Sequence, residues 1–186
     1  MYQLLLAKLA RVLDGARIPY MVIGGQAVLV HGEPRLTRDI DITLGVDATE
    51  LQKVLIAATA ASLTPSVSDP EAFVRTTNVL PLSDSPTGLR VDLIFSFTPY
   101  ESEAIRRAIA VTFDGVPVRF ASAEDLIIHK LVAGRPRDIE DVAGILARKP
   151  SLDDLYLDGW LASFHEIVNR DLVSIFAALK KASLPR

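Results

Sequence analysis

The chain of 186 residues has no cysteine, few aromatic residues (6%) and no apolar run near the roughly 20 residues that cross a bilayer. Without cysteine, a disulfide framework and a cysteine zinc site are excluded. Residues 1–13 also lack the small-residue cleavage site of a secretory signal. We therefore expect a cytoplasmic protein that does not enter a membrane.

Charge of one sign is not in large excess, because 20 Lys and Arg side chains stand against 23 Asp and Glu, a net charge of −3. Proteins that coat nucleic acid neutralise many phosphates with Lys and Arg. The few aromatic residues also offer few stacking platforms for single strands. If nucleic acid is a partner, we expect it to be a substrate that is touched at one end.

Apolar periodicity predicts helices and strands that alternate as far as residue 120. Asp114-Gly115, between the last two strand patterns, is a typical hairpin turn. The expected helices of this part are residues 4–14, 26–31, 49–63 and 99–109, and the expected strands are residues 20–23, 38–44, 73–76, 89–97, 111–113 and 116–120.

After residue 120 only helices are expected. Ser122, with Asp125 three residues later, resembles a capping box and starts a helix that Gly134 ends. Pro136 suits the first turn of the next helix, which runs to about residue 148. From Ser151 on, apolar residues at helical spacing predict one long amphipathic helix.

Asp39 and Asp41 alternate with isoleucines in residues 38–44. Both carboxylates therefore project from one face of the strand, while Ile40 and Ile42 enter the core. Two carboxylates about 4 Å apart repel by roughly 4 kcal/mol at an effective dielectric near 20, so a cation is expected between them. Hard oxygen ligands on a shared face suit Mg²⁺.

Asp92 supplies a third carboxylate, from a strand whose apolar face is formed by residues such as Val91 and Leu93. An acid in the middle of a strand is costly unless it is paired, hydrogen-bonded or bound to a metal. Three such carboxylates can hold two metal ions about 4 Å apart, which activate an incoming hydroxyl and stabilise a leaving oxygen. The pattern indicates phosphoryl or nucleotidyl transfer.

Gly24 and Gly25 lie between an expected strand and an expected helix. Small residues at such a turn let backbone N–H groups and a helix N-terminus approach an anionic phosphate closely. In most proteins a Gly-Gly pair is simply a turn, and that alternative stays open for the pair by itself. Together with the acidic strands, the pair favours a phosphate-binding turn.

Three segments together resemble the nucleotidyltransferases of the DNA-polymerase-β superfold: VIGGQAV at 22–28, RLTRDIDI at 35–42 and VDLI at 91–94. The similarity is greatest to the bacterial group that includes the abortive-infection (Abi-type) nucleotidyltransferase toxins and minimal antibiotic nucleotidyltransferases.

This resemblance covers roughly residues 18–148. It implies an α+β fold with the mixed twisted sheet of polymerase-β-like nucleotidyltransferases, flanking helices and a C-terminal helical segment. We expect a nucleotidyltransferase-like domain at residues 1–148 and a helical extension, packed on it, at residues 149–186.

Residue by residue, the resemblance implies that Gly24 and Gly25 contact the triphosphate of an NTP. It implies that Asp39 and Asp41 bind Mg²⁺ or Mn²⁺. Asp92 would complete the site as a third metal ligand or as the general base.

Residues 129–142, HKLVAGRPRDIEDV, resemble a shortened form of the family's later lysine and Arg-Asp pair. This implies that Lys130 neutralises triphosphate charge and that Asp138 is a fourth polar residue of the site. The alternative for Lys130 is a solvated helix face. For Asp141 we expect a cap or a salt bridge within its own helix.

Arg35 and Arg38 flank the segment that carries the acids. They either clamp phosphate or acceptor, or pair with Glu33, Asp39 or solvent, and we assign Arg38 to nucleotide binding. Thr37 either orients Asp39 through its hydroxyl or simply suits the strand.

These residues predict a Mg²⁺-dependent nucleotidyltransferase that moves a nucleoside monophosphate from an NTP to an acceptor, which is a small molecule, a tRNA or a protein. The alternative is a nucleotide- or partner-binding module of a toxin–antitoxin-like system without catalysis, because fold does not fix function. A third class, metal-dependent phosphodiesterases or nucleases, uses the same acids. The last helix offers a face for a partner protein or a homodimer.

Overall fold

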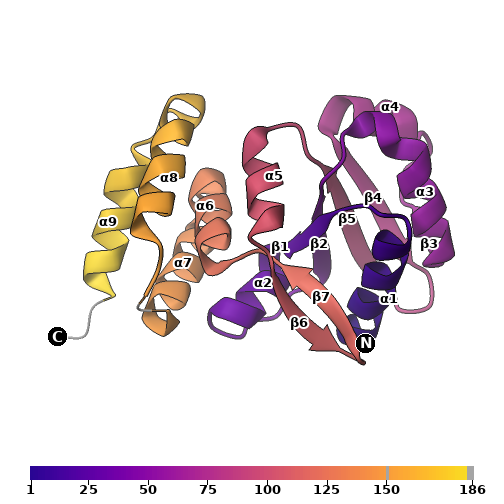
Figure 1. Cartoon of the computed structure of the whole chain (residues 1–186), viewed down its shortest axis with the longest axis horizontal. Coiled ribbons are helices and arrows are strands. Elements are labelled where there is room, and N and C mark those ends of the chain that lie inside the picture. Colours follow the sequence, from indigo (N-terminus) through magenta and orange to yellow (C-terminus); the bar gives the residue numbers. More distant parts are fainter. Residues whose placement is uncertain (150, 184–186) are drawn as a thin grey trace. The chain divides into compact units, whose positions relative to one another are not determined.

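A computed structural model describes residues 1–149 and 151–183 of the chain, which form two compact units (Figure 1). The first unit contains Met1–Gln26 and Thr37–Ala121, and the second contains Ala27–Leu36 and the residues from Ser122 on. The predicted domain boundary at residue 148 stays a prediction. Residues 150 and 184–186 of the predicted extension lie outside the described residues. No helix among the described residues is long and apolar enough to cross a membrane.

A seven-stranded mixed sheet, in the order β3-β4-β5-β2-β1-β7-β6, forms the centre of the first unit. β2 pairs in parallel with β5, and β1 in parallel with β7, whereas the other neighbours are antiparallel. The mixed sheet confirms the predicted α+β class. Its strands are β1 (Tyr20–Ile23), β2 (Asp39–Leu44), β3 (Leu63–Pro65), β4 (Val79–Asp84), β5 (Leu89–Phe95), β6 (Ile109–Phe113) and β7 (Val116–Phe120).

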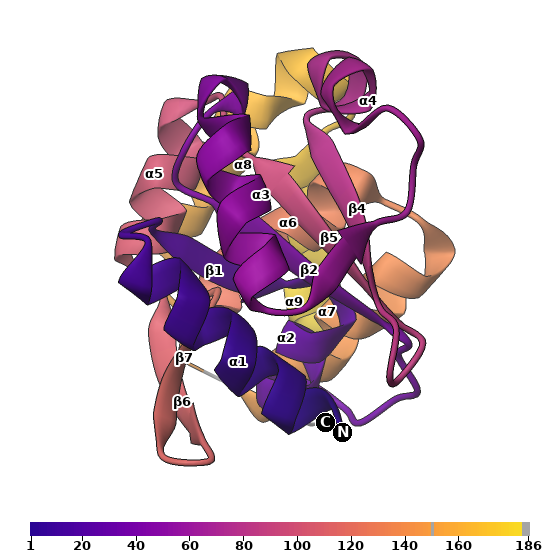
Figure 2. The ribbon, with the colours of Figure 1, turned by 90° about the vertical axis from the view of Figure 1, so that its right-hand side faces the viewer.

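Alternation of apolar and polar residues gives the central strands two different faces. Ile40 and Ile42 of β2 and Val91 of β5 are completely buried on the face opposite to the acids. Helices α1 and α3 cover one face of this sheet and α5 lies on the other (Figures 1 and 2). The helices of this unit are α1 (Tyr2–Gly15), α3 (Leu51–Ala60), which follows a 3₁₀ turn at Ala48–Glu50, α4 (Pro70–Thr77) and α5 (Pro99–Arg106).

The hairpin predicted from Asp114-Gly115 is confirmed. Both residues have positive φ angles, 51° and 72°, which is the backbone of a two-residue type I′ turn. Phe113 and Val116 are paired directly on either side of the turn.

The short strand expected at residues 73–76 is wrong, because these residues lie in helix α4. The side chain of Asp69 accepts a hydrogen bond from the backbone N–H of Ala72, and Pro70 occupies the first turn. Asn78, in the left-handed conformation, ends the helix. The capping residues outweigh the β-branched residues of this segment, which had favoured a strand.

The second unit is helical, and its described elements after residue 121 are four helices. Ser122 caps α6 by accepting from the backbone N–H of Asp125, and left-handed Gly134 ends the helix, as predicted. Pro136 lies in the first turn of α7. α8 packs on α6 and α9 packs on α7 and α8. These helices are α6 (Ala123–Ala133), α7 (Pro136–Arg148), α8 (Asp154–Val168) and α9 (Leu172–Ala182), and α2 (Gly24–His31) begins in the first unit and continues into the second.

The one long helix predicted after Ser151 is wrong, because the segment forms two helices. Asn169 is left-handed (φ 49°) and ends α8, and Asp171 caps α9 by accepting from the backbone N–H of Ser174. A left-handed residue breaks a helix whatever the apolar spacing on either side of it. The apolar periodicity continues across Asn169, so by itself it predicts one helix.

Removing the cap of α4 should test the helix that replaces the predicted strand. Asp69→Ala loses the hydrogen bond to Ala72, so we expect a loss of about 1 kcal/mol of unfolding free energy. Urea unfolding monitored by circular dichroism measures the loss. Asp158→Ala, exposed in the middle of α8, is the control and should change stability by less than about 0.5 kcal/mol. Equal stability of the two variants would contradict the cap.

Candidate active site

Asp39, Asp41 and Asp92 lie on one face of the sheet in the first unit. In the parallel pairing of β2 with β5, Asp41 is opposite Asp92 and Asp39 is opposite Arg90. All three carboxylates are half-buried. The structure therefore brings the predicted acids onto adjacent strands. It also places Arg90 opposite Asp39. Arg90 is not among the predicted site residues, although its two-residue spacing from Asp92 indicates the same face.

The pKa of the Asp92 carboxyl is raised above its ordinary value. Burial is the largest cause. The charge of Arg90 lowers the pKa, and the negative charge of Asp39 raises it again. A raised pKa strengthens Asp92 as a proton acceptor, which suits the role of general base.

Gly24 and Gly25 begin α2 directly after β1, and each contacts a side chain of the segment that carries the acids. Gly24 has a left-handed backbone (φ +61°), and a Cβ atom there would lie 2.0 Å from Oδ2 of Asp41. A Cβ atom on Gly25 would lie 2.3 Å from Oγ1 of Thr37. Both positions therefore require glycine. As a result, the Asp41 carboxylate lies against the first turn of α2.

The residues around Asp41 fit a hard divalent cation. Carboxylates from adjacent strands offer the oxygen ligands that Mg²⁺ and Mn²⁺ prefer, and the missing Cβ at Gly24 gives the Asp41 carboxylate its room. Within residues 1–149 and 151–183, no group of three or more His, Cys, Asp and Glu side chains is arranged as a ready-made metal site. Metal binding by Asp39, Asp41 and Asp92 therefore stays a prediction.

Lys130 belongs to the second unit, where it is only 5% exposed and lies in a network of ion pairs. Its Nζ is 2.8 Å from Oδ1 of Asp138 and 2.8 Å from Oδ2 of Asp141. Arg35 donates two hydrogen bonds to the carboxylate of Asp141, at 2.7 and 2.9 Å, and Arg135 donates to Asp138 at 2.6 Å. The expectation that Asp141 pairs within its helix is wrong, because these two partners lie on other segments.

Burial alone would raise the pKa of both carboxyls in this network, but the hydrogen bonds that they accept outweigh burial. Arg135 and Lys130 hold the pKa of Asp138 below its ordinary value, and Arg35 and Lys130 do the same for Asp141. Both acids are therefore ionised at neutral pH. The assignment of Lys130 to the triphosphate stays a prediction.

Arg38 directly precedes β2 in the first unit, and its side chain is exposed. An exposed guanidinium next to the acidic segment is accessible to an anion, and its assignment to nucleotide binding stays a prediction. The first unit thus holds the glycine pair, the three acids and Arg38, whereas Lys130 and Asp138 belong to the second.

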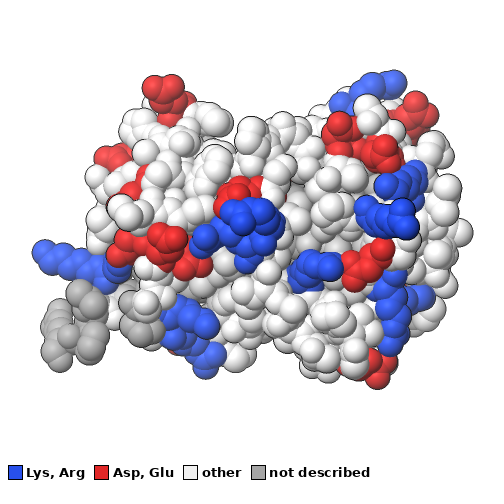
Figure 3. All heavy atoms as spheres, in the orientation of Figure 1, with Lys and Arg blue, Asp and Glu red and all other residues white. Residues whose placement is uncertain are grey.

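Acidic and basic side chains are interspersed over the described residues of the face drawn in Figure 3. This pattern agrees with the small net charge of −3.

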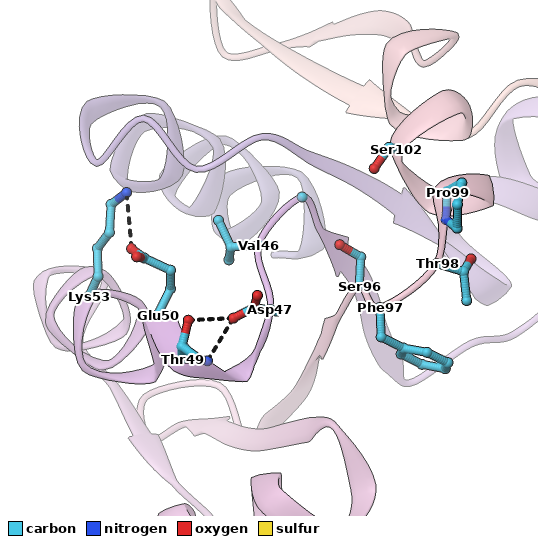
Figure 4. Close-up of a pocket in the computed structure, with 11 residues that line it drawn as sticks. Val46, Asp47, Thr49, Glu50, Lys53, Ser96, Phe97, Thr98, Pro99 and Ser102 are labelled. Carbon is cyan, nitrogen blue, oxygen red and sulfur yellow. Dashed lines mark hydrogen bonds and ion pairs between the residues drawn. The ribbon is translucent and has the colours of Figure 1, made fainter.

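A hollow of about 720 Å³ lies beyond the carboxyl ends of β2 and β5, at the opposite end of these strands from Asp39 (Figure 4). In it, Asp47 accepts hydrogen bonds from the backbone and hydroxyl of Thr49. Glu50 forms an ion pair with Lys53 at 3.5 Å. The two carboxylates of this hollow therefore have partners within it, Thr49 and Lys53.

Comparison with known proteins gives a family match over residues 4–174, to the family described as "Nucleotidyl transferase AbiEii toxin, Type IV TA system". A comparison with curated proteins finds no match.

Solved structures of similar fold include an antigenic nucleotidyltransferase-like protein from Paracoccidioides brasiliensis, with a TM-score of 0.55, 23% identity and coverage of 95% of this chain and 92% of that one. The structure of ANT(2")-Ia in complex with adenylyl-2"-tobramycin has a TM-score of 0.54 and 14% identity, and the match covers 98% of this chain and 99% of that one. The lincosamide antibiotic adenylyltransferase LnuA has a TM-score of 0.50 and 15% identity, and the match covers 73% of this chain and 90% of that one. At these identities the likeness shows the fold.

Asp138→Asn should destabilise the protein, because Lys130 loses one of two buried partners. Breaking a buried pair costs about 3–5 kcal/mol. The lowered pKa of Asp138 means that its stabilisation is complete above the ordinary carboxyl pKa and is lost as pH falls through the lowered value. In urea unfolding from about pH 7 to about pH 3, the deficit of the variant should therefore shrink with acid.

The matched control for this network is Glu140→Gln, which neutralises an exposed acid on the same helix and should cost less than about 0.5 kcal/mol. Asp138→Asn as stable as this control at neutral pH would contradict the network.

Asp92→Asn should raise the melting temperature of the metal-free protein at neutral pH. The raised pKa of Asp92 means that folding disfavours its ionised form, so stability falls as pH rises through that pKa. The neutral amide avoids this cost, and its advantage should vanish in acid, where Asp92 is protonated. Thermal unfolding in EDTA over a pH series measures the difference, with Asp158→Asn as the exposed control. A variant that melts below wild type at neutral pH would refute the prediction.

Proposed function

The chain belongs to the AbiEii family of nucleotidyltransferase toxins of type IV toxin–antitoxin systems, and from this premise we propose that it uses Mg²⁺ to move a nucleoside monophosphate from an NTP to an acceptor hydroxyl. The supporting observation is the parallel pairing of Asp41 with Asp92, with Asp39 on the same face. Ionised acids at neighbouring positions on one sheet face repel one another and are stabilised by cations. A module that only binds a partner gains little from keeping that repulsion.

In this reaction Asp39 and Asp41 hold the metal, and Asp92 is a third ligand or the general base. Bound Mg²⁺ or Mn²⁺ supplies positive charge that stabilises the charge developing at the α-phosphate. Gly24 and Gly25 bring backbone N–H groups of the first turn of α2 to the triphosphate.

The acceptor hydroxyl attacks the α-phosphorus, a new P–O bond forms and pyrophosphate leaves. We assign the proton of the hydroxyl to Asp92, whose raised pKa makes it a stronger acceptor than an ordinary carboxylate.

Two cations support the binding of the triphosphate in this proposal. Arg38, exposed before β2, supplies a guanidinium from the first unit. Lys130 supplies an ammonium from the second, where Asp138 and Asp141 take two of its three donors.

The acceptor in this proposal is a small molecule, a tRNA or a protein. One similar structure contains an adenylylated tobramycin, which is a property of that protein. The family description, a toxin of a type IV toxin–antitoxin system, supports an antitoxin that opposes this protein. We place its action in the cytoplasm as part of the proposal.

Labelling of a cell extract tests the proposal. With Mg²⁺ and NTPs labelled at the α-phosphate, the protein should label one component of the extract and release pyrophosphate. The double variant Asp39→Asn/Asp41→Asn should lower the rate by about a hundredfold or more. Asp47→Asn is the matched control beyond the other end of β2, because asparagine caps as well as aspartate.

Three outcomes separate the alternatives. Labelling by the double variant at the wild-type rate would overturn the assignment of the acids. If NTPs raise the melting temperature equally with and without Mg²⁺ and no pyrophosphate is released, the protein is a binding module. Release of mononucleotides would identify a phosphodiesterase or nuclease.

A further inference from the structure

Asp39 lies at the end of the β2 ladder. β2 pairs with β5 from Asp39 onward, where Asp39 is opposite Arg90. Its pairing with β1 begins only at Asp41, which is opposite Ile23. At Ile23 the neighbouring strand ends and α2 begins. On the side of β1, the position of the Asp39 backbone therefore depends on contacts other than strand pairing.

The contact found at this place is Thr37 against Gly25. A Cβ atom on Gly25 would lie 2.3 Å from Oγ1 and 2.8 Å from Cβ of Thr37, so the threonine side chain rests directly on the glycine backbone. The Thr37 hydroxyl also donates to the backbone carbonyl of Asp39 at 3.4 Å. One side chain thus connects the first turn of α2 to the residue that starts β2.

On the premise of nucleotidyl transfer, we propose that Thr37 is a positioning residue. By packing against Gly25, it fixes the start of β2 and holds Asp39 in place relative to the first turn of α2. Gly25 lacks a side chain because Thr37 fills that space. In the same way, the missing side chain of Gly24 leaves room for Asp41, because a Cβ atom at Gly24 would lie 2.0 Å from Oδ2 of Asp41.

A second explanation of Gly25 makes a different prediction. If its side chain is missing only to let a phosphate approach, a Cβ atom blocks the ligand whatever stands at position 37. If the space is required by Thr37, removing the threonine side chain makes room for the new Cβ atom. A double variant therefore separates the two explanations.

The experiment compares four variants by kcat and by KM for the NTP. Gly25→Ala should lower kcat by about a hundredfold and Thr37→Ala by about tenfold, with KM changed by less than about threefold, because a displaced Asp39 acts on the transition state more than on binding. Thr37→Ser keeps Oγ1 and should recover most of the loss seen in Thr37→Ala. Gly25→Ala/Thr37→Gly should be faster than Gly25→Ala. Leu36→Ala, an exposed neighbour, is the control.

Amide hydrogen exchange, measured without nucleotide, tests the packing of Thr37 on Gly25 independently of catalysis. Thr37→Ala should speed exchange at residues 37–41 relative to wild type and Leu36→Ala. If Thr37→Ala exchanges faster but the wild-type protein transfers no nucleotide, the packing of Thr37 on Gly25 is supported and the proposed function is refuted.

Two results would overturn the positioning role of Thr37. The first is wild-type exchange and wild-type kcat in Thr37→Ala. The second is a Gly25→Ala variant with a raised KM that the Thr37→Gly change does not improve, which would assign Gly25 to the phosphate.

Discussion

Repulsion between carboxylates on two neighbouring parallel strands is the constraint on which the site depends. Burial is the largest cause of the raised pKa of Asp92 on β5, and the negative charge of Asp39 on β2 raises it further. The first unit is built to withstand this repulsion. Ile40 and Ile42 anchor β2 from the buried face, and Asp41 is held by ladders on both sides. The missing side chains of Gly24 and Gly25 leave room for those of Asp41 and Thr37.

The acids of the proposed site and those around Lys130 lie in opposite electrostatic environments. In the second unit, Asp138 and Asp141 lie among Lys130 and two arginines, and their pKa values are lowered. In the first unit, burial and the charge of Asp39 raise the pKa of Asp92. Asp138 and Asp141 are thus neutralised by the fold itself and stabilise it. Asp39, Asp41 and Asp92 carry a charge that a bound cation would balance, which is the physical basis of the proposed catalysis.

Local signals in the sequence predicted much of the fold but failed where one residue decided between structures. The Asp-Gly hairpin, the Ser122 cap and the left-handed Gly134 follow from local chemistry and are confirmed. The break at Asn169 was missed, because apolar spacing continues on both sides of it. The bidentate pair of Arg35 with Asp141 joins residues 106 positions apart, and neither residue carries a local sign of its partner.

By itself, the sequence determined that Asp39 and Asp41 share one face of a strand and that Gly24-Gly25 lies where a strand gives way to a helix, because alternation and backbone freedom are local properties. Only the tertiary structure decided that Asp92 is the neighbour of Asp41, because strand register depends on pairing between distant segments. It also decided why the glycines are needed. The missing Cβ atoms leave room for Asp41 and Thr37, which reach them from another segment of the chain.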